Sequence, residues 1–153
     1  MDNIGKPEVV TQKRVIDFFV NKLRYNYIGN LKDRENSNID EAKLIKWLTD
    51  HGHTEAIAFR AVEELVNAAT NLQEGLYTAN REVYQLLKFG AKIKENADEN
   101  ETTVYFIDWE TPGENLFEIA EEVTVVANNE KRPDLVIYLN GIAVAVIELK
   151  KST

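Results

Sequence analysis

Apolar residues recur at helical spacing along roughly the first 90 positions of the chain. After Thr11, which can cap a helix, Val15, Phe18, Phe19 and Leu23 follow the i, i+3, i+4 rule for one helix face. The same spacing predicts three more helices, over about 40–51, 54–71 and 80–89, with stop signals at Gly52 and Gly90. The polar, turn-rich stretch 25–38 predicts a loop.

Beyond residue 90 the hydrophobic period changes to that of strands. The β-branched and aromatic run 103–109 predicts a strand, and 117–126 predicts a second extended segment. A loop is expected over 128–132. We place the boundary before the fourth predicted helix, which gives a helical N-terminal region, 1–75, and a mixed α/β region, 76–153.

Two apolar runs near the end of the chain predict a β-hairpin. The runs 135–139 and 142–149 flank Asn140-Gly141, the strongest hairpin signal in the sequence. Both runs are apolar at consecutive positions, as strands buried on both faces are. The predicted fold class is α+β, with a helical N-terminal region followed by a mainly antiparallel sheet.

Composition narrows the classes of protein to which this chain can belong. Its 153 residues are 44% hydrophobic, which is too apolar for a disordered chain. No apolar run reaches the ~18–20 residues that a membrane span needs, and no signal peptide is visible. The absence of such a run leads us to expect no membrane partner. The absence of cysteine excludes disulfides and fits a cytoplasmic protein. The net charge of −8 argues against binding nucleic acid by bulk charge alone.

Charged residues at the ends of the predicted hairpin are the main candidates for chemistry. Asp134 opens the first apolar run, Glu148 closes the second, and Lys150 follows two positions later. Two carboxylates at one strand end form a hard-oxygen site suited to Mg²⁺, which can activate water and stabilise charge on a phosphodiester. Lys150 could position the water or offset phosphate charge. A simpler interpretation also fits, in which these charges face solvent and share no role.

The length of the hairpin loop decides whether the two carboxylates share a face. A regular two-residue loop would pair Leu139 with Ile142 and put Glu148 on the face opposite Asp134. A three-residue loop would pair Tyr138 with Ile142 and bring Asp134, Glu148 and Lys150 to one face. We predict the second register or an equivalent bulge.

Other titratable residues have a structural interpretation beside a functional one. His51 and His53 flank Gly52, and a histidine favoured by the helix C-terminus is a better interpretation than a metal pair. Glu82 fits a solvated helix face, and Glu121 fits a strand edge. Whether Glu82 or Glu121 joins the candidate metal site stays open.

Several segments together resemble a known family. The run from Arg132-Pro133-Asp134 through Asn140-Gly141 to Glu148-Leu149-Lys150 resembles the N-terminal endonuclease domain of the restriction (R) subunit of type I restriction enzymes. Ile107-Asp108-Trp109 and the following Pro112, Glu114, Asn115 and Phe117 also match that family's pattern. The resemblance extends in order over nearly the whole chain, with further matching segments at 27–30, 36–41, 83–90 and 121–125.

The resemblance implies a PD-(D/E)xK nuclease fold and Mg²⁺-dependent cleavage of double-stranded DNA. Under that assignment Asp134 and Glu148 are the metal-binding acids, and Lys150 is the catalytic lysine. It also implies assembly with methyltransferase and specificity subunits, and an ATP-driven translocase motor elsewhere in the same polypeptide. The only ATP expected is therefore bound by that motor, since no phosphate-binding loop motif is present here.

The resemblance also leads us to expect a fragment of a longer subunit. The helix and strand that follow Glu-x-Lys in this fold lie beyond Thr153, so 76–153 would form a truncated PD-(D/E)xK core. We expect weak or no cleavage by this chain alone. The alternative function is a non-catalytic docking or assembly module that keeps a nuclease-like fold.

Overall fold

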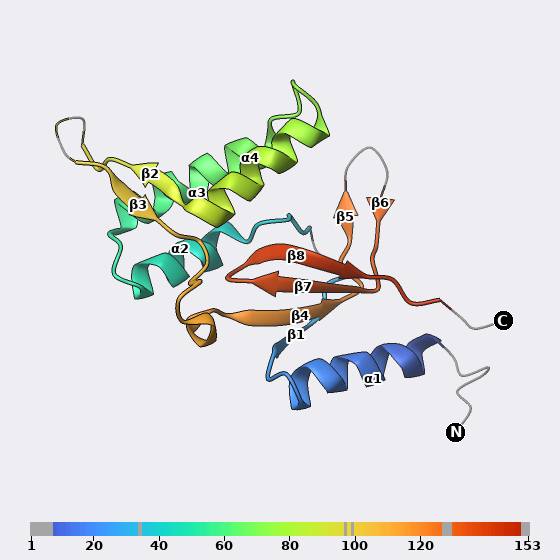
Figure 1. The fold of residues 1–153 in the computed structure, drawn as a ribbon. Helices are drawn as coiled ribbons and strands as arrows, with labels where there is room; N and C mark the ends of the chain where they lie inside the picture. Colours follow the sequence, from blue (N-terminus) through green and yellow to red (C-terminus); the bar gives the residue numbers. More distant parts are fainter. Residues whose placement is uncertain (1–7, 34, 97, 99, 127–129, 151–153) are drawn as a thin grey trace. The chain divides into compact units, whose positions relative to one another are not determined.

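The computed structural model describes residues 8–33, 35–96, 98, 100–126 and 130–150 (Figure 1). The chain forms two compact units: unit 1 contains Met1–Asn38 and Leu116–Thr153, and unit 2 contains Ile39–Asn115. The functional division into 1–75 and 76–153 stays a prediction. Among the described residues, no helix combines the length and the apolar character needed to cross a lipid bilayer.

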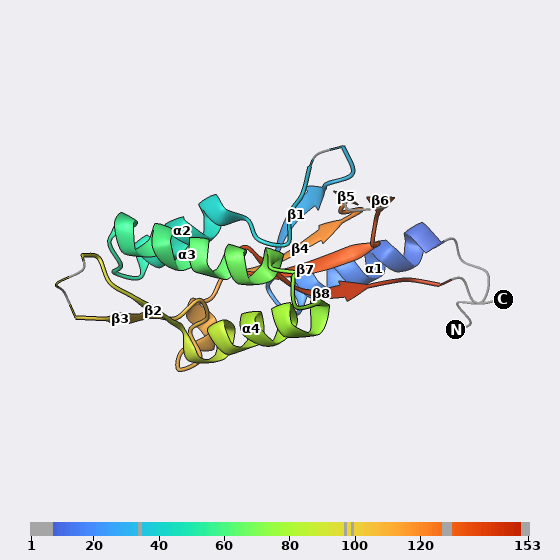
Figure 2. The same ribbon diagram turned by 90° about the horizontal axis from the view of Figure 1, so that it is seen from above.

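Unit 2 contains three helices and a short hairpin. Helices α2 (Glu41–Asp50), α3 (Glu55–Thr70) and α4 (Leu76–Phe89) are followed by β2 (Ala91–Ile93) and β3 (Thr102–Val104). Helix α3 is the centre of the unit, because it contacts α2, α4 and both strands (Figure 2). Fully buried side chains on α2 and α3 supply the apolar contacts, among them Leu44, Leu48, Val62 and Leu65.

The ends of these helices follow the predicted capping signals. Asp40 accepts a hydrogen bond from the Lys43 N–H at 3.1 Å and caps α2, and Thr54 caps α3 in the same way through Ile57 N–H at 3.3 Å. Gly90 ends α4 with φ +77°, and a Cβ there would lie 2.7 Å from the Val104 carbonyl oxygen. Glycine is therefore required where α4 turns into the hairpin.

Two sequence predictions in unit 2 need correction. Helix α4 begins at Leu76, four residues before the predicted start near 80. The predicted strand over 103–109 ends at Val104, because the backbone beyond it bonds to side chains instead of a neighbouring strand. Asp108 Oδ1 accepts from two following N–H groups, and the Asn115 side chain bonds both Asp108 N–H and Asp108 C=O. The 3₁₀ turn η1 (Pro112–Glu114) closes this segment.

Unit 1 is built on a four-stranded sheet with one helix packed on it. Its order is β1 (Asn26–Asn30), β4 (Phe117–Glu121), β7 (Leu135–Leu139) and β8 (Ile142–Ile147). The three strands β4, β7 and β8 are antiparallel neighbours, whereas β1 runs parallel to β4. The α+β class is confirmed, and the sheet is mixed. Helix α1 (Glu8–Asn21) lies alongside the sheet (Figure 1).

Strand β1 corrects the predicted loop over 25–38. It contains Tyr27 and Ile28 but also Asn26, Gly29 and Asn30, so its sequence lacks strand alternation. Pairing with β4 makes it a strand, because the parallel ladder supplies the hydrogen bonds that its local sequence does not predict. The described part of α1 begins at Glu8, so Thr11, the predicted cap, lies inside the helix.

Each face of the sheet has its own apolar cluster. On the α1 face, Ile16 packs with Ile119, Leu135 and Ile137. On the other face, Leu31, Ala120, Val123, Val136 and Tyr138 pack together. Alternate residues of β7 therefore go to opposite clusters, as the pleat requires, and both predicted apolar faces of this strand are buried.

A second short hairpin interrupts the predicted extended run 117–126. Strand β4 ends at Glu121, because Glu122 adopts a left-handed φ of +52°. Strands β5 (Val125–Val126) and β6 (Glu130–Lys131) then pair antiparallel, where the sequence predicts a loop over 128–132. Residues 127–129 lie outside the described part of the chain.

The turn of the β7–β8 hairpin is fixed to β4 by Asn140. This residue is fully buried with φ +53°, its Oδ1 accepts from Leu116 N–H at 2.7 Å, and its own N–H donates to Leu116 C=O at 2.9 Å. Asparagine tolerates the left-handed region and supplies the buried acceptor that Leu116 needs.

Substitutions of Asn140 are expected to destabilise the fold, and the size of the effect depends on whether the new residue tolerates the left-handed backbone conformation. Asn140→Ala loses the side-chain acceptor and strains the left-handed backbone, so the free energy of unfolding should fall by about 2–4 kcal/mol. Asn140→Gly also loses the side-chain hydrogen bonding but tolerates the left-handed backbone, so its loss should be about 1 kcal/mol smaller. Urea unfolding followed by far-UV circular dichroism measures both, and equal losses would contradict the role of φ.

Candidate functional site

Asp134 is fixed from both sides at the start of β7. It is half-buried and follows the buried Pro133. Its carbonyl oxygen accepts a hydrogen bond from Glu122 N–H at 3.0 Å, which ties it to the end of β4. Its side-chain Oδ2 accepts from Leu149 N–H at 2.6 Å, which ties it to the segment after β8. The carboxylate is thus held at one end of three neighbouring strands.

The hairpin register differs from the predicted one but has the same consequence. The turn is a two-residue loop with Leu139 opposite Ile142, so the predicted three-residue loop is wrong. Further along, Tyr138 pairs with Ala143 and Ile137 with Ala145, which makes Val144 the extra residue of a β-bulge. The alternative that we predicted, an equivalent bulge, is confirmed.

The bulge sets the face on which the candidate residues lie. Leu135 pairs with Ile147, and the same register continued by one residue puts Asp134 opposite Glu148. Ile147 and Leu149 pack against the α1-face cluster that contains Leu135. Since side chains alternate, Glu148 and Lys150 belong to the other face, together with Asp134.

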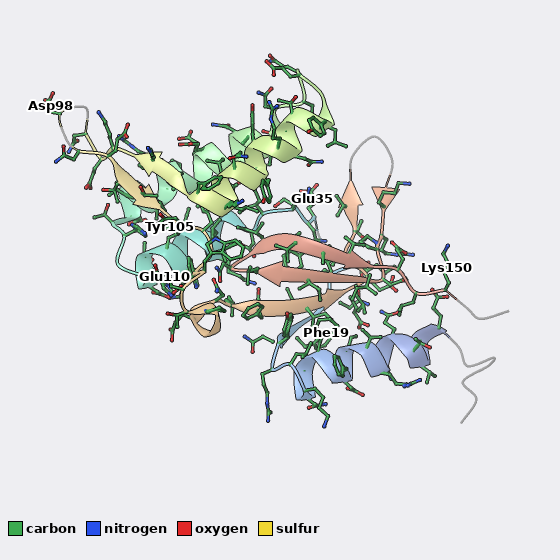
Figure 3. All side chains as sticks on the ribbon, in the orientation of Figure 1. Phe19, Glu35, Asp98, Tyr105, Glu110 and Lys150 are labelled. Carbon is green, nitrogen blue, oxygen red and sulfur yellow. The ribbon has the colours of Figure 1, made fainter. Side chains whose placement is uncertain are left out.

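The three candidate side chains differ in exposure. Asp134 is half-buried, whereas Glu148 and Lys150 are exposed. Figure 3 shows Lys150 on the segment that follows β8. No group of three or more His, Asp or Glu residues in the described part of the chain is arranged to hold a metal ion. Two carboxylates are nevertheless enough for Mg²⁺, which keeps several waters and uses few protein ligands.

Glu121 lies on the opposite face from Asp134. It pairs with Leu135 across β4 and β7, and its carboxylate accepts from Gln12 Nε2 at 2.9 Å and from the Tyr27 hydroxyl at 2.7 Å. Burial, followed by this hydrogen bond and the negative charge of Glu121, raises the pKa of Tyr27 to about 12. Glu121 therefore joins α1 and β1 to β4 and is not directed to the side of Asp134.

Glu122, and not Glu121, is the acidic residue next to Asp134. The sequence alone does not show which of these two neighbours lies there. Besides the backbone bond to Asp134, its carboxylate forms an ion pair with Arg132 Nε at 3.0 Å. That pair joins the two ends of the β5–β6 hairpin just before Asp134. The positive φ of Glu122 produces this arrangement, and a periodicity analysis has no signal for it.

The other titratable candidates lie in unit 2. Glu82 is half-buried on α4 and lines a cavity between residues of α3 and α4. His51 is the C-cap of α2, stacks on Trp47 with ring centroids 4.0 Å apart, and bonds Trp47 C=O through Nδ1 at 2.7 Å. Burial, with a smaller contribution from the charge of His51, lowers the pKa of His53.

Comparisons with known proteins agree on one family. A family model described as the N terminus of the type I restriction enzyme R protein matches residues 6–153. A Methanocaldococcus jannaschii protein named for the endonuclease subunit of type I restriction enzyme MjaIXP is 30% identical over 110 residues, 68% of this chain and 10% of that protein. The endonuclease subunit of type I restriction enzyme HindI from Haemophilus influenzae is 28% identical over 95 residues, 59% of this chain and 9% of that protein.

The two relatives are much longer than this chain. The chain spans about a tenth of the length of the curated relatives that it matches. No solved structure matches it.

His53 should titrate below its ordinary pKa of 6.5, because burial disfavours the imidazolium. A depressed folded-state pKa means that the unfolded chain binds the proton more readily. The stability linked to His53 is therefore complete above pH 6.5 and is lost as the pH falls through 6.5 towards the folded-state value. Proton NMR of the ring measures the midpoint.

The His51→Gln variant separates the two causes of the shift. Removing the like charge should move the His53 midpoint upward, but burial should keep it below 6.5. A wild-type midpoint at or above 6.5 would contradict the assignment.

Proposed function

Because the chain belongs to the family of type I restriction enzyme R protein N termini, we propose that it is a Mg²⁺-dependent endonuclease domain acting on double-stranded DNA. In this proposal Asp134 and Glu148 bind the metal, and Lys150 is the catalytic lysine. The observation that carries this proposal is the β-bulge at Val144. With this one extra residue, the alternation of side chains supports a shared face for Asp134, Glu148 and Lys150 at one end of the β7–β8 hairpin.

The donor set fits a hard divalent cation. Asp134 is held through Oδ2, so its other oxygen is presented at a defined position. The register that pairs Leu135 with Ile147, continued by one residue, would bring Glu148 opposite Asp134. Carboxylate oxygens are the ligands that Mg²⁺ prefers, and its remaining positions suit water and phosphate oxygens. The bound ion would supply Lewis-acid stabilisation of the charge that develops on a phosphodiester.

Lys150 contributes a positive charge to this face. Its ammonium group has three donors on a flexible stem, which suits it to orient an attacking water and to offset charge on the phosphate in the transition state. It is exposed and lies two residues beyond Glu148, so it can reach a substrate at the carboxylates. Asp134, fixed by two backbone contacts, sets the position from which the others act.

The proposed cleavage also involves other subunits and domains of the restriction enzyme, which would deliver the DNA. We propose assembly with methyltransferase and specificity subunits, and coupling to an ATP-driven translocase in the full-length R subunit. An acidic domain of net charge −8 repels free DNA at long range, so cleavage would depend on DNA delivered by those other parts.

Asp134→Ala or Lys150→Ala in the assembled restriction enzyme should abolish cleavage while ATP-driven translocation continues. We expect a loss of at least roughly 10²-fold, because each substitution removes a group that stabilises transition-state charge. Plasmid cleavage and a triplex-displacement assay measure the two activities. Asp17→Asn removes an exposed charge from α1 of the same unit and serves as the matched control. Unchanged cleavage in both alanine variants would favour a docking module.

A further inference from the structure

A cavity in unit 2 has walls unlike those of the candidate nuclease face. Its volume is 420 Å³, which lies within the usual range for small-ligand sites. Five aromatic or imidazole rings line it together with two acids and Ile107: the rings are Trp47, His51, His53, Tyr105 and Trp109, and the acids are Asp108 and Glu110. Figure 3 shows Tyr105 and Glu110 on the irregular segment that follows β3.

Hydrogen bonds fix the aromatic walls in place. The Trp47 indole donates to Glu114 C=O at 3.2 Å, and the His51 ring stacks on Trp47. The Trp109 indole donates to Leu87 C=O at 3.1 Å, although 58% of this residue stays exposed. Trp47 is only 8% exposed and His51 covers one face of its ring, so Trp109 supplies the indole surface that a ligand can contact. Tyr105 is also 51% exposed. Rigid exposed rings lose little entropy when a ligand binds.

The charge of the cavity is negative. Asp108 is held in a turn through Oδ1, which accepts from Glu110 N–H at 3.0 Å and Thr111 N–H at 2.7 Å. Glu110 is exposed beside it. The described residues that line the cavity include no lysine or arginine, and burial lowers the pKa of His53, which favours its neutral form. Two carboxylates thus face an aromatic cavity without a cation from the cavity wall.

We propose that this cavity binds the guanidinium group of an arginine side chain presented by a partner protein. A planar guanidinium stacks on indole and phenol faces and donates hydrogen bonds to carboxylates in the same plane. Phosphates and nucleic-acid backbones would be repelled by Asp108 and Glu110. A lysine ammonium is more strongly hydrated and cannot stack, so it fits these walls less well. The inference does not depend on the metal site of unit 1.

The chain contains two tryptophans, and both line this cavity, so intrinsic fluorescence reports its occupancy directly. The 153-residue chain is titrated with the capped peptide Gly-Gly-Arg-Gly-Gly and with matched lysine and citrulline peptides. We expect a saturable change in emission with the arginine peptide. Binding of the uncharged citrulline peptide should be at least about tenfold weaker, because it lacks the charge-assisted hydrogen bonds.

Variants test whether the cavity acids are responsible. Glu110→Gln and Asp108→Asn each remove one charge, and asparagine can preserve the turn at 108; each should weaken the arginine peptide about tenfold. Glu114→Gln removes the same charge from an exposed neighbour outside the cavity and should leave binding unchanged. Circular dichroism checks that each variant folds.

Four outcomes would overturn the assignment. They are the absence of a saturable change, equal binding of the arginine and citrulline peptides, equal binding of the arginine and lysine peptides, and an equal loss in Glu114→Gln. A single-stranded oligonucleotide that quenches the same tryptophans and competes with the peptide would also overturn it, in favour of a nucleic-acid site.

Discussion

Side chains along a strand alternate between the two faces of its sheet, so one inserted residue moves every later side chain to the other face. Val144 is such an insertion in β8. With a regular two-residue turn alone, Glu148 and Lys150 would belong to the face covered by α1. The bulge instead directs Ile147 and Leu149 to the α1 cluster and leaves the charged residues on the face of Asp134. The one extra residue in β8 therefore determines both which side chains pack in the core and which lie on the face of the candidate site.

The acidic residues near Asp134 differ in the partners that their carboxylates bind. Glu121 is used structurally, because Gln12 and Tyr27 bond its carboxylate on the α1 face. Glu122 is turned out of the strand by its positive φ and pairs with Arg132. Asp134 keeps contact with both flanking segments through one backbone and one side-chain bond. Adjacent carboxylates with different partners can share a small region without forming a single acidic cluster.

Family membership and local geometry support different parts of the functional account. The family match covers nearly the whole chain and identifies the protein class. The register of the β7–β8 hairpin supports the roles proposed for Asp134, Glu148 and Lys150. Unit 2 offers a different chemistry, because its cavity joins fixed aromatic rings to acids. The proposed nuclease face lies in unit 1, and the proposed guanidinium site lies in unit 2.

The sequence by itself determined the features that depend on neighbouring residues: the caps at Asp40 and Thr54, the stops at Gly52 and Gly90, and the Asn140-Gly141 turn. Tertiary structure decided the rest. Strand β1 exists because β4 pairs with it, and the segment after Val104 leaves the strand because Asn115 bonds its backbone. The bulge at Val144 places Ile147 and Leu149 against the α1 cluster. The partners of β1, Ile147 and Leu149 are distant in sequence, and Asn115 is seven residues from Asp108. Local periodicity contains no information about any of these contacts.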